Sequence, residues 1–228
     1  MLLKTSPQAA SLVEIAQRYS ASFQESPAEE YIHHRGLGSL ATTLGFGYVA
    51  APATGHEKHL GRLAIPYIRP AGGEHAVATI RFRCINAACL KNPDGSWRDE
   101  ELHEGHGKYQ SLPGSKPALY NTRSLIRPSR YVGVSEGEFD AASAELAGIP
   151  TVGVPGVSGW RDHFDPALLG YEVVFAFTDG DEPGERFVNM LADRLPSLVP
   201  IQFGKKSDVN KFVVENGPKA LREKCGLE

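Results

Sequence analysis

The pattern of apolar and polar positions changes near residue 130 and divides the chain into two parts. In the second part, short apolar runs alternate with stretches of helical spacing, which is typical of a mostly parallel sheet covered by helices. The predicted strands there are 131–135, 151–154, 172–177 and 199–203. The predicted helices are 138–147, a short one near 161–169, 182–195, and a pair from 208. We therefore predict a doubly wound α/β domain over 130–228.

In the first part, 1–129, helices precede strands. Pro7 and Pro27 each follow a serine, a combination that favours the start of a helix. The segments that follow are a helical turn at 39–44 and strands at 46–49, 63–69 and 76–84, the last two joined as a hairpin. We predict an α+β subdomain that ends at 127–129 and carries an inserted polar loop at 85–107, which contributes no core residues.

The composition is that of an ordinary soluble globular protein. With 228 residues, 41% hydrophobic and 22% charged, the chain can bury one large core or two modest ones. No apolar stretch approaches the roughly 20 residues that span a bilayer. The apolar stretch at the start of the chain is too short to be the hydrophobic region of a signal peptide. Three cysteines do not form a disulfide framework and suit a reducing compartment. We expect a cytoplasmic protein, in the bacterial cytoplasm or in a phage-infected host.

The net charge of −3 hides a division between the two parts. Residues 1–129 contain 14 Lys+Arg and 11 Asp+Glu, a net charge of +3, whereas 130–228 contain 10 and 16, a net charge of −6. A basic part suits binding to a polyanion, and an acidic part suits binding to metal. The alternative is chance variation in surface charge.

Carboxylates follow two predicted strands of the second part. Glu136 comes after 131–135, and Asp179 and Asp181 come after 172–177. Ligands bind at the carboxyl ends of strands in an open α/β sheet, and three carboxylates there repel one another unless a divalent cation shares them. This arrangement predicts magnesium chemistry on phosphate; the alternative for the two aspartates is a turn acid and a helix cap.

Four further acids lie in the first turns of the helices after these strands, where negative charge is favoured anyway. We interpret them as capping or solvated rather than catalytic: Glu138, Asp140, Glu182 and Glu185.

Several motifs occur in the order of a known family. In the second part these are the two acidic turns and GKKSDVN at 204–210. In the first part they are YIHHRGL at 31–37, LGFGY at 44–48, GRLAIP at 61–66, IRFR at 80–83 and KYQSLPG at 108–114. Together they resemble the catalytic core of DnaG-type primases, whose second domain is called Toprim.

The resemblance implies RNA primer synthesis on single-stranded DNA from nucleoside triphosphates, with Mg²⁺ or Mn²⁺ as cofactor. It assigns catalysis and metal binding to Glu136, Asp179 and Asp181, and a fourth metal ligand to Asp208. The residues that we assign to nucleotide and template are Arg62, Arg81, Arg83, Lys108, Tyr109, Lys116 and Lys205; six are basic, and Tyr109 could stack on a base or sugar. Arg81 and Arg83 share one face of a strand by its period of two. For Arg62, Lys116, Arg83 and Lys108 the alternative is a role in solubility only, and for Lys205 it is pairing with nearby acids.

The family also implies partners. Full-length members usually carry a cysteine-rich zinc module and a helicase-interacting domain, which are not recognisable here. We therefore expect a replicative helicase and a separate zinc-module protein as partners, typical of a bacteriophage primase. The alternatives are a Toprim nuclease or topoisomerase-like enzyme, and a non-catalytic subunit of a replication complex.

The polar loop contains residues that could ligate zinc. Cys84 and Cys89 together with His103 and His106 offer two thiols and two imidazoles, a set suited to tetrahedral coordination. However, the cysteines are separated by four residues instead of the usual two, and Cys84 fits equally as a core residue at a strand end. The sequence alone therefore favours no zinc.

Overall fold

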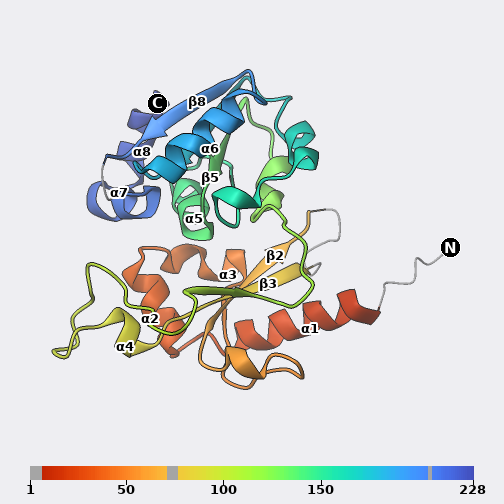
Figure 1. Ribbon diagram of the computed structural model, residues 1–228, viewed down its shortest axis with the longest axis vertical. Helices are drawn as coiled ribbons and strands as arrows, with labels where there is room; N and C mark the ends of the chain where they lie inside the picture. Colours follow the sequence, from red (N-terminus) through yellow and green to blue (C-terminus); the bar gives the residue numbers. More distant parts are fainter. Residues whose placement is uncertain (1–6, 71–76, 205–206) are drawn as a thin grey trace. The chain divides into compact units, whose positions relative to one another are not determined.

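The computed structural model describes residues 7–70, 77–204 and 207–228 (Figure 1). The chain forms two compact units. Unit 1 comes mostly from residues before Ser115, and unit 2 contains the chain from Lys116 together with Arg35–Leu40 and Ile68–Pro70. Within these described ranges, no helix is both long enough and apolar enough to cross a membrane.

Unit 1 is a small four-stranded sheet with helices. Its strands are β1 (Gly47–Tyr48), β2 (Leu63–Ile68), β3 (Val77–Arg83) and β4 (Tyr109–Ser111), in this order across the sheet. Its helices are α1 (Pro7–Ala21), α2 (Pro27–His34), α3 (Ala41–Leu44), α4 (Ala87–Leu90) and the 3₁₀ turn Glu57–His59. Strands β1 and β2 pair antiparallel, as do β3 and β4. Helix α1 packs on β1 and β3, where Tyr19 joins Ile80 and Phe82 in the core.

The loop 85–107 differs from its prediction. It contains the short helix α4, and Asn86 is the N-cap of this helix. The Asn86 side chain accepts a hydrogen bond from the Ala88 backbone N–H. Ile85, Cys89 and Leu90 are buried, so the loop does contribute to the core. The prediction was wrong because the apolar residues between Ile85 and Leu90 form too short a stretch, in an otherwise polar loop, to show a helical or strand period.

Unit 2 is a four-stranded parallel sheet with the order β6-β5-β7-β8, which confirms the predicted α/β class. Its strands are β5 (Tyr131–Ser135), β6 (Thr151–Gly153), β7 (Val173–Thr178) and β8 (Leu198–Gln202). Its α-helices are α5 (Glu138–Leu146), α6 (Glu182–Ala192), α7 (Val209–Asn216) and α8 (Pro218–Lys224). The 3₁₀ turns are Gly38–Leu40, Thr122–Ile126, Val157–Gly159 and Asp162–Ala167.

Alternating side chains of the central strands enter different cores. Val174 and Ala176 of β7 pack in a cluster with Phe187 of α6. Phe175 and Phe177 of the same strand pack in a second cluster, with residues of α5, α7 and α8. The sheet is therefore covered on both faces, as its continuous apolar runs predict.

The predicted boundary at 127–129 lies inside unit 2. The backbones of Tyr120 and Gly153 exchange hydrogen bonds of 2.8 and 3.2 Å. Tyr120, which precedes the first predicted strand of this part, therefore pairs with the last residue of β6. Leu119 is buried in the same core as β5. A single bridge of this kind has no signature in the local pattern.

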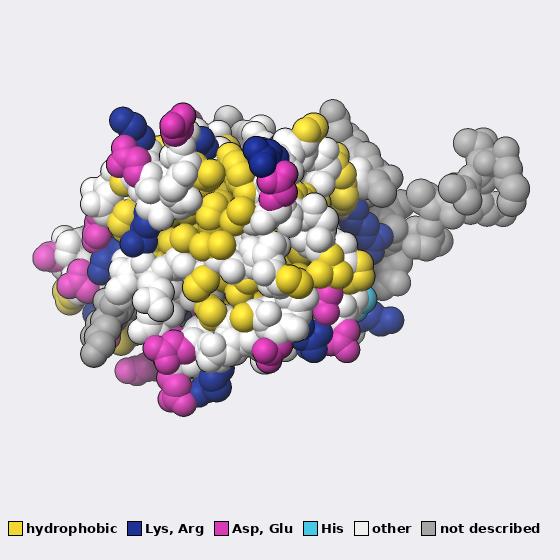
Figure 2. Space-filling view, turned by 90° about the horizontal axis from the view of Figure 1, so that it is seen from above, with side chains coloured by type: hydrophobic (Ala, Val, Ile, Leu, Met, Phe, Trp, Pro, Cys, Tyr) yellow, Lys and Arg dark blue, Asp and Glu magenta, His cyan; other side chains and the backbone are white. Residues whose placement is uncertain are grey.

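Strand β8 is the edge of the parallel sheet. Its residues Val199 and Pro200 are exposed. Figure 2 shows hydrophobic side chains gathered in the middle of one face. Proline has no backbone N–H to offer another strand, which protects the edge from pairing with a second chain.

Candidate metal and nucleotide sites

The carboxyl ends of β5 and β7 place Glu136 beside Asp179. The register pairs Ser135 with Phe177, so the residues that follow lie at the same edge of the sheet. The Asp179 backbone N–H donates a hydrogen bond to Glu136 Oε1 at 3.1 Å. Asp181 begins α6 as its N-cap and accepts a hydrogen bond from the Gly184 backbone at 2.9 Å. Asp181 is thus both a helix cap and a neighbour of the other two acids.

The proximity of these acids changes the acidity of Glu136. Burial raises the pKa of its carboxyl group to about 7, and the charges of Asp179 and Asp181 act in the same direction. The hydrogen bond from the Asp179 backbone opposes them only in part. Repulsion between unneutralised carboxylates is the condition that a bound cation relieves.

Asp140, which the sequence assigned to capping, belongs to this acidic set. The pKa of its carboxyl group is raised to about 7, first by burial and then by the charges of Asp208 and Asp179. A hydrogen bond of 3.1 Å from the Asn210 backbone and the charge of Arg35 oppose the shift. The spacing of four residues from Glu136, one helical turn into α5, is the only sequence signal that pointed to it.

Asp208 is the neighbour whose charge contributes most to the raised pKa of Asp140. It is the N-cap of α7 and accepts a hydrogen bond of 2.6 Å from the Lys211 backbone. Asn210 fixes this region, because its side chain donates to the Arg35 carbonyl at 2.8 Å and to Ser143 Oγ at 2.7 Å. The sequence did not identify Arg35 or Asn210 as part of the site, since both act through contacts distant in the chain.

The acidic set suits a hard divalent cation in its chemistry. All its donors are carboxylate oxygens, the ligands that Mg²⁺ and Mn²⁺ prefer. In the part of the chain that the structure describes, these carboxylate oxygens do not converge on one point. The one group of three or more potential ligand atoms that does converge there consists of other residues. Asp181 and Asp208 accept hydrogen bonds from the backbone of their own helices, as N-cap residues do.

The remaining acids near the site have other environments. Glu182 forms an ion pair with Arg186 one turn away, and Glu185 is exposed, as predicted. Glu138 is only 1% exposed, so of its two predicted roles, capping and solvated, the solvated one is wrong.

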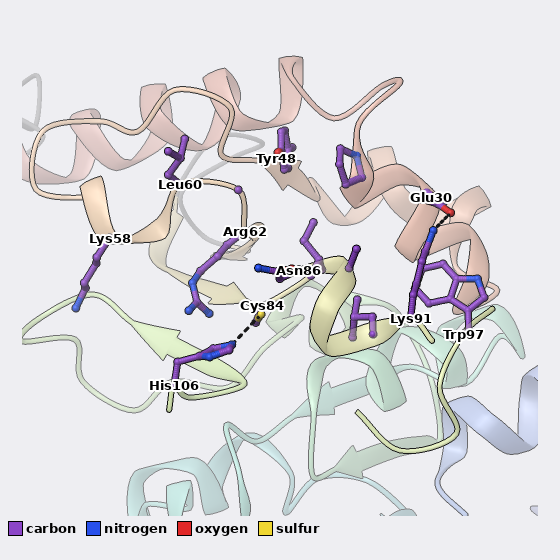
Figure 3. A pocket seen from close by; sticks show the side chains of 15 residues that line it. Glu30, Tyr48, Lys58, Leu60, Arg62, Cys84, Asn86, Lys91, Trp97 and His106 are labelled. Carbon is purple, nitrogen blue, oxygen red and sulfur yellow. Dashed lines mark hydrogen bonds and ion pairs between the residues drawn. The ribbon is translucent and has the colours of Figure 1, made fainter. Parts of the chain in front are cut away.

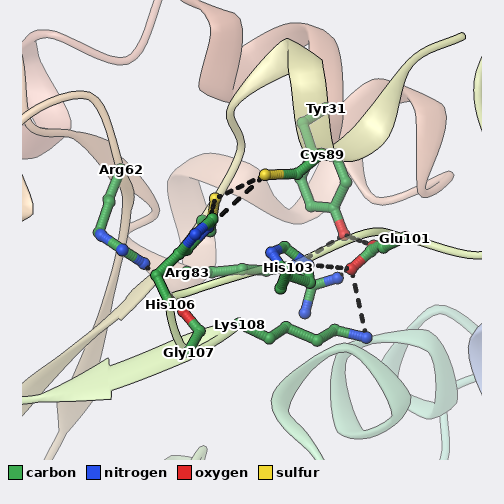
Figure 4. A network of polar contacts seen from close by, with 10 residues as sticks. Tyr31, Arg62, Arg83, Cys89, Glu101, His103, His106, Gly107 and Lys108 are labelled. Atoms are coloured by element: carbon green, nitrogen blue, oxygen red, sulfur yellow. Dashed lines mark hydrogen bonds and ion pairs between the residues drawn. The ribbon is translucent and has the colours of Figure 1, made fainter.

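In unit 1, Arg81 and Arg83 lie against the same ring, as their shared strand face predicts. Their guanidinium carbons are 4.6 and 4.8 Å from the ring centre of Tyr109. Arg83 is nevertheless buried, at 1% exposure. Its Nε donates to the Tyr31 hydroxyl at 2.7 Å, and its Nη2 forms an ion pair of 2.5 Å with Glu101 (Figure 4).

This burial corrects the predicted role of Arg83. The side chain has no exposed surface for a phosphate, and its charge is already balanced by Glu101. Arg83 therefore positions Tyr109 and Glu101 instead of contacting nucleic acid. Lys108 remains accessible, because its side chain is 48% exposed although its Nζ lies 3.3 Å from Glu101.

A pocket of about 520 Å³ in unit 1 carries positive charge (Figure 3). Arg62, a predicted nucleotide-binding residue, lines it together with Lys58 and Lys91, which the sequence did not single out. The Arg62 guanidinium also donates to the Gly107 carbonyl at 3.4 Å. Lys116, another predicted residue, is exposed and belongs to unit 2. Lys205 falls outside the described residues.

Comparison with solved structures identifies the fold. A primase from Aquifex aeolicus, solved with its zinc-binding and RNA polymerase domains, matches with a TM-score of 0.74 and 18% identity; the match covers 98% of this chain and 62% of that one. The RNA polymerase domain of Mycobacterium tuberculosis primase DnaG matches with a TM-score of 0.71 and 16% identity, over 97% and 84%. A DnaG primase catalytic domain bound to single-stranded DNA matches with a TM-score of 0.71 and 17% identity, over 96% and 79%.

Sequence comparison gives a nearer relative. No protein-family model matches the chain. The Gene 57 protein of Mycobacterium phage D29 is 43% identical over 165 residues, which cover 72% of this chain and 97% of the phage protein. The chain thus has the fold of the DnaG primase catalytic core and belongs to the family of the Gene 57 protein of Mycobacterium phage D29.

Proposed function

We propose that this protein is the catalytic core of a DNA primase, which joins ribonucleotides into short RNA primers on single-stranded DNA. The observation that carries the proposal is the acidic set at the carboxyl ends of β5 and β7, in a chain with the fold of DnaG catalytic cores. The related domain solved with single-stranded DNA supports that template.

In this proposal Glu136, Asp179, Asp181 and Asp208 hold Mg²⁺ or Mn²⁺, and Asp140 joins them. When bound, such a cation neutralises the triphosphate and lowers the barrier to in-line attack by a primer 3′-hydroxyl. Glu136 and Asp140 must first release the protons that their raised pKa values retain near neutral pH. The N-cap bonds of Asp181 and Asp208 fix the helix ends from which their carboxylates project.

Unit 1 supplies the contacts to phosphate. Arg62 and Lys108 have accessible cationic groups, and Arg81 is held against the Tyr109 ring. Guanidinium groups bind phosphate through two hydrogen bonds, and ammonium groups bind it as point charges. These residues therefore bind the template backbone and the incoming nucleotide.

The phage relative supports a role in bacteriophage DNA replication. A replicative helicase and a separate zinc-module protein are the partners that we propose for such a core. Both partners are inferred from the resemblance to primases.

The test is an analysis of products. The protein is incubated with single-stranded DNA, labelled ribonucleotides and Mg²⁺ or Mn²⁺, with and without a starting dinucleotide. We expect short labelled RNA from the wild type and from Glu172→Gln, an exposed acid paired with Arg130, and none from Asp179→Ala. Shortened DNA would indicate a nuclease instead, and unchanged substrates a non-catalytic subunit.

A further inference from the structure

Four side chains of the loop 85–107 and the strand before it converge on one point in unit 1. Cys84 follows β3, Cys89 lies in α4, and His103 and His106 precede β4. One potential ligand atom from each lies within 4.8 Å of all the others. Both cysteines are buried, so the cluster is closed on one side by protein (Figure 4).

The distances match those of a tetrahedral ion. Zinc with Zn–S bonds of about 2.3 Å and Zn–N bonds of about 2.0 Å holds two sulfurs about 3.8 Å apart, and a sulfur and a nitrogen about 3.5 Å apart. The observed distances are 3.8 Å between the sulfurs of Cys84 and Cys89, and 3.2 and 3.5 Å from these sulfurs to His106 Nε2. The sulfurs are too far apart for a disulfide, whose bond length is about 2.05 Å.

Hydrogen bonds also orient both imidazoles as ligands. Nδ1 of His106 lies 3.1 Å from the Glu104 carbonyl and donates a hydrogen bond to it. Nε2 therefore carries no proton, and its lone pair is available to a metal beside the two sulfurs. Nε2 of His103 lies 3.0 Å from the Glu101 carboxylate. Its other ring nitrogen, Nδ1, is buried and has no hydrogen-bond partner among the residues that the structure describes.

A buried imidazole nitrogen without a partner costs free energy unless something coordinates it. A histidine whose second nitrogen donates to a carboxylate or a carbonyl is the usual arrangement around a protein-bound metal. Two thiolates and two imidazoles at these distances select zinc over magnesium or calcium.

We propose that Cys84, Cys89, His103 and His106 form a structural zinc site. The site closes the loop 85–107 onto the end of β3. Glu101, which orients His103, also pairs with Arg83 through Oε1 and with Lys108 through Oε2 (Figure 4). The zinc therefore fixes the carboxylate that positions the basic residues of unit 1.

The first test is metal content. The tag-free protein, purified under reducing conditions with zinc in the medium and no chelator, is passed through gel filtration and analysed by elemental mass spectrometry. We expect one zinc per chain in the wild type, in Asp179→Asn and in Cys225→Ser, which removes the third cysteine outside the cluster. Cys89→Ser and His106→Asn should lose the zinc. A wild type without zinc, or Cys89→Ser with a full equivalent, would overturn the proposal.

The second test needs no variant that risks misfolding. Cobalt replaces zinc in the wild-type protein, and the absorption spectrum is recorded. We expect intense d–d bands of a tetrahedral ion and a thiolate-to-cobalt charge-transfer band. Modification of the thiols with an organomercurial should release one zinc per chain when Cys84 and Cys89 react, and Cys225, which lies outside the cluster, raises the total to three thiols modified per zinc. A spectrum without the thiolate band, or release that does not depend on the thiols, contradicts the site.

The third test concerns the carboxylate. Glu101→Gln should lower the zinc affinity about 10- to 100-fold, as measured by competition with a chromogenic chelator. Glu104→Gln is the matched control, because Glu104 contacts His106 only through its backbone carbonyl and should leave the affinity unchanged. Equal affinity in both variants would remove Glu101 from the site.

Discussion

Two residues of the acidic set, Glu136 and Asp140, have strongly raised pKa values. Each has a carboxyl group whose pKa is about 7, against ordinary values of 4.5 and 3.8. Each is held there by burial first and by neighbouring carboxylates next. Such groups are destabilising when charged, which is typical of a site built for a ligand rather than for the fold.

The stability of the cation-free protein should therefore fall as the pH rises. Between the ordinary and the folded pKa values the folded chain binds more protons than the unfolded chain, so the free energy of unfolding decreases from about pH 4 to about pH 7. Melting curves with no divalent cation added should show this decrease. Glu136→Gln should flatten it and melt higher than the wild type above about pH 7. His59, whose pKa burial lowers to about 4, adds stability over the same interval in both proteins, so the test is the difference between the two curves. Equal slopes in the wild type and Glu136→Gln would contradict the shift assigned to Glu136.

Arg83 makes a second prediction at the residue scale. Arg83→Met removes the buried partner of Glu101 and should lower the free energy of unfolding by about 3 kcal/mol, near the lower end for a broken buried pair because Lys108 and His103 still contact Glu101. Arg130→Met breaks an exposed pair and should cost less than about 1 kcal/mol. Urea denaturation of both variants provides the comparison, and equal losses would show that the Arg83 pair is not special.

At the scale of elements, the start of α6 is fitted closely against the acidic turn. A Cβ added at Gly184 would lie 2.8 Å from Glu136 Oε1 and closer still to the Asp179 carbonyl. The helix can approach β5 and β7 only because this position has no side chain. The approach brings Asp181, the N-cap of α6, next to Glu136.

Gly184→Ala should therefore reverse the usual effect of this substitution. In an ordinary helix alanine is better than glycine by about 1 kcal/mol. Here the clash should shift the helix, destabilise the protein by about 1–3 kcal/mol, and reduce primer synthesis up to about 100-fold through misplaced carboxylates. Gly170→Ala, at a position with no atoms within 4 Å of the added Cβ, is the control. Unchanged melting and activity in Gly184→Ala would show that α6 has room to adjust.

The sequence predicted elements better than contacts. In unit 2 the strand–helix alternation predicts every α-helix and strand to within a few residues, because buried parallel strands and amphipathic helices have strong periodic patterns. In unit 1 the sequence pattern does not predict β4, which has only three residues. The burial of Arg83 depends on Glu101, which lies 18 residues away in a loop whose path no local pattern fixes. Asp140 was misassigned because a first-turn acid is compatible with capping as well as with a metal site.

The chain has a basic first part and an acidic second part, so we predict that the proposed binding to single-stranded DNA is largely electrostatic. Binding to single-stranded DNA should weaken with salt, with a slope of log affinity against log salt of about −0.7 for each phosphate contacted. Lys108→Ala should make the slope shallower by about 0.7, whereas Arg130→Ala, an exposed cation of unit 2, should not change it. Fluorescence anisotropy over a salt series measures both, and identical slopes would remove Lys108 from the interface.

The most direct test of the central claim is the extension of an RNA primer, annealed to a DNA template, by one nucleotide in Mg²⁺. The wild type should add only the ribonucleotide complementary to the template. Asp179→Asn should reduce this addition by orders of magnitude while retaining the melting temperature and zinc content of the wild type. No template-directed addition by the wild type, or equal addition by Asp179→Asn, would contradict the account.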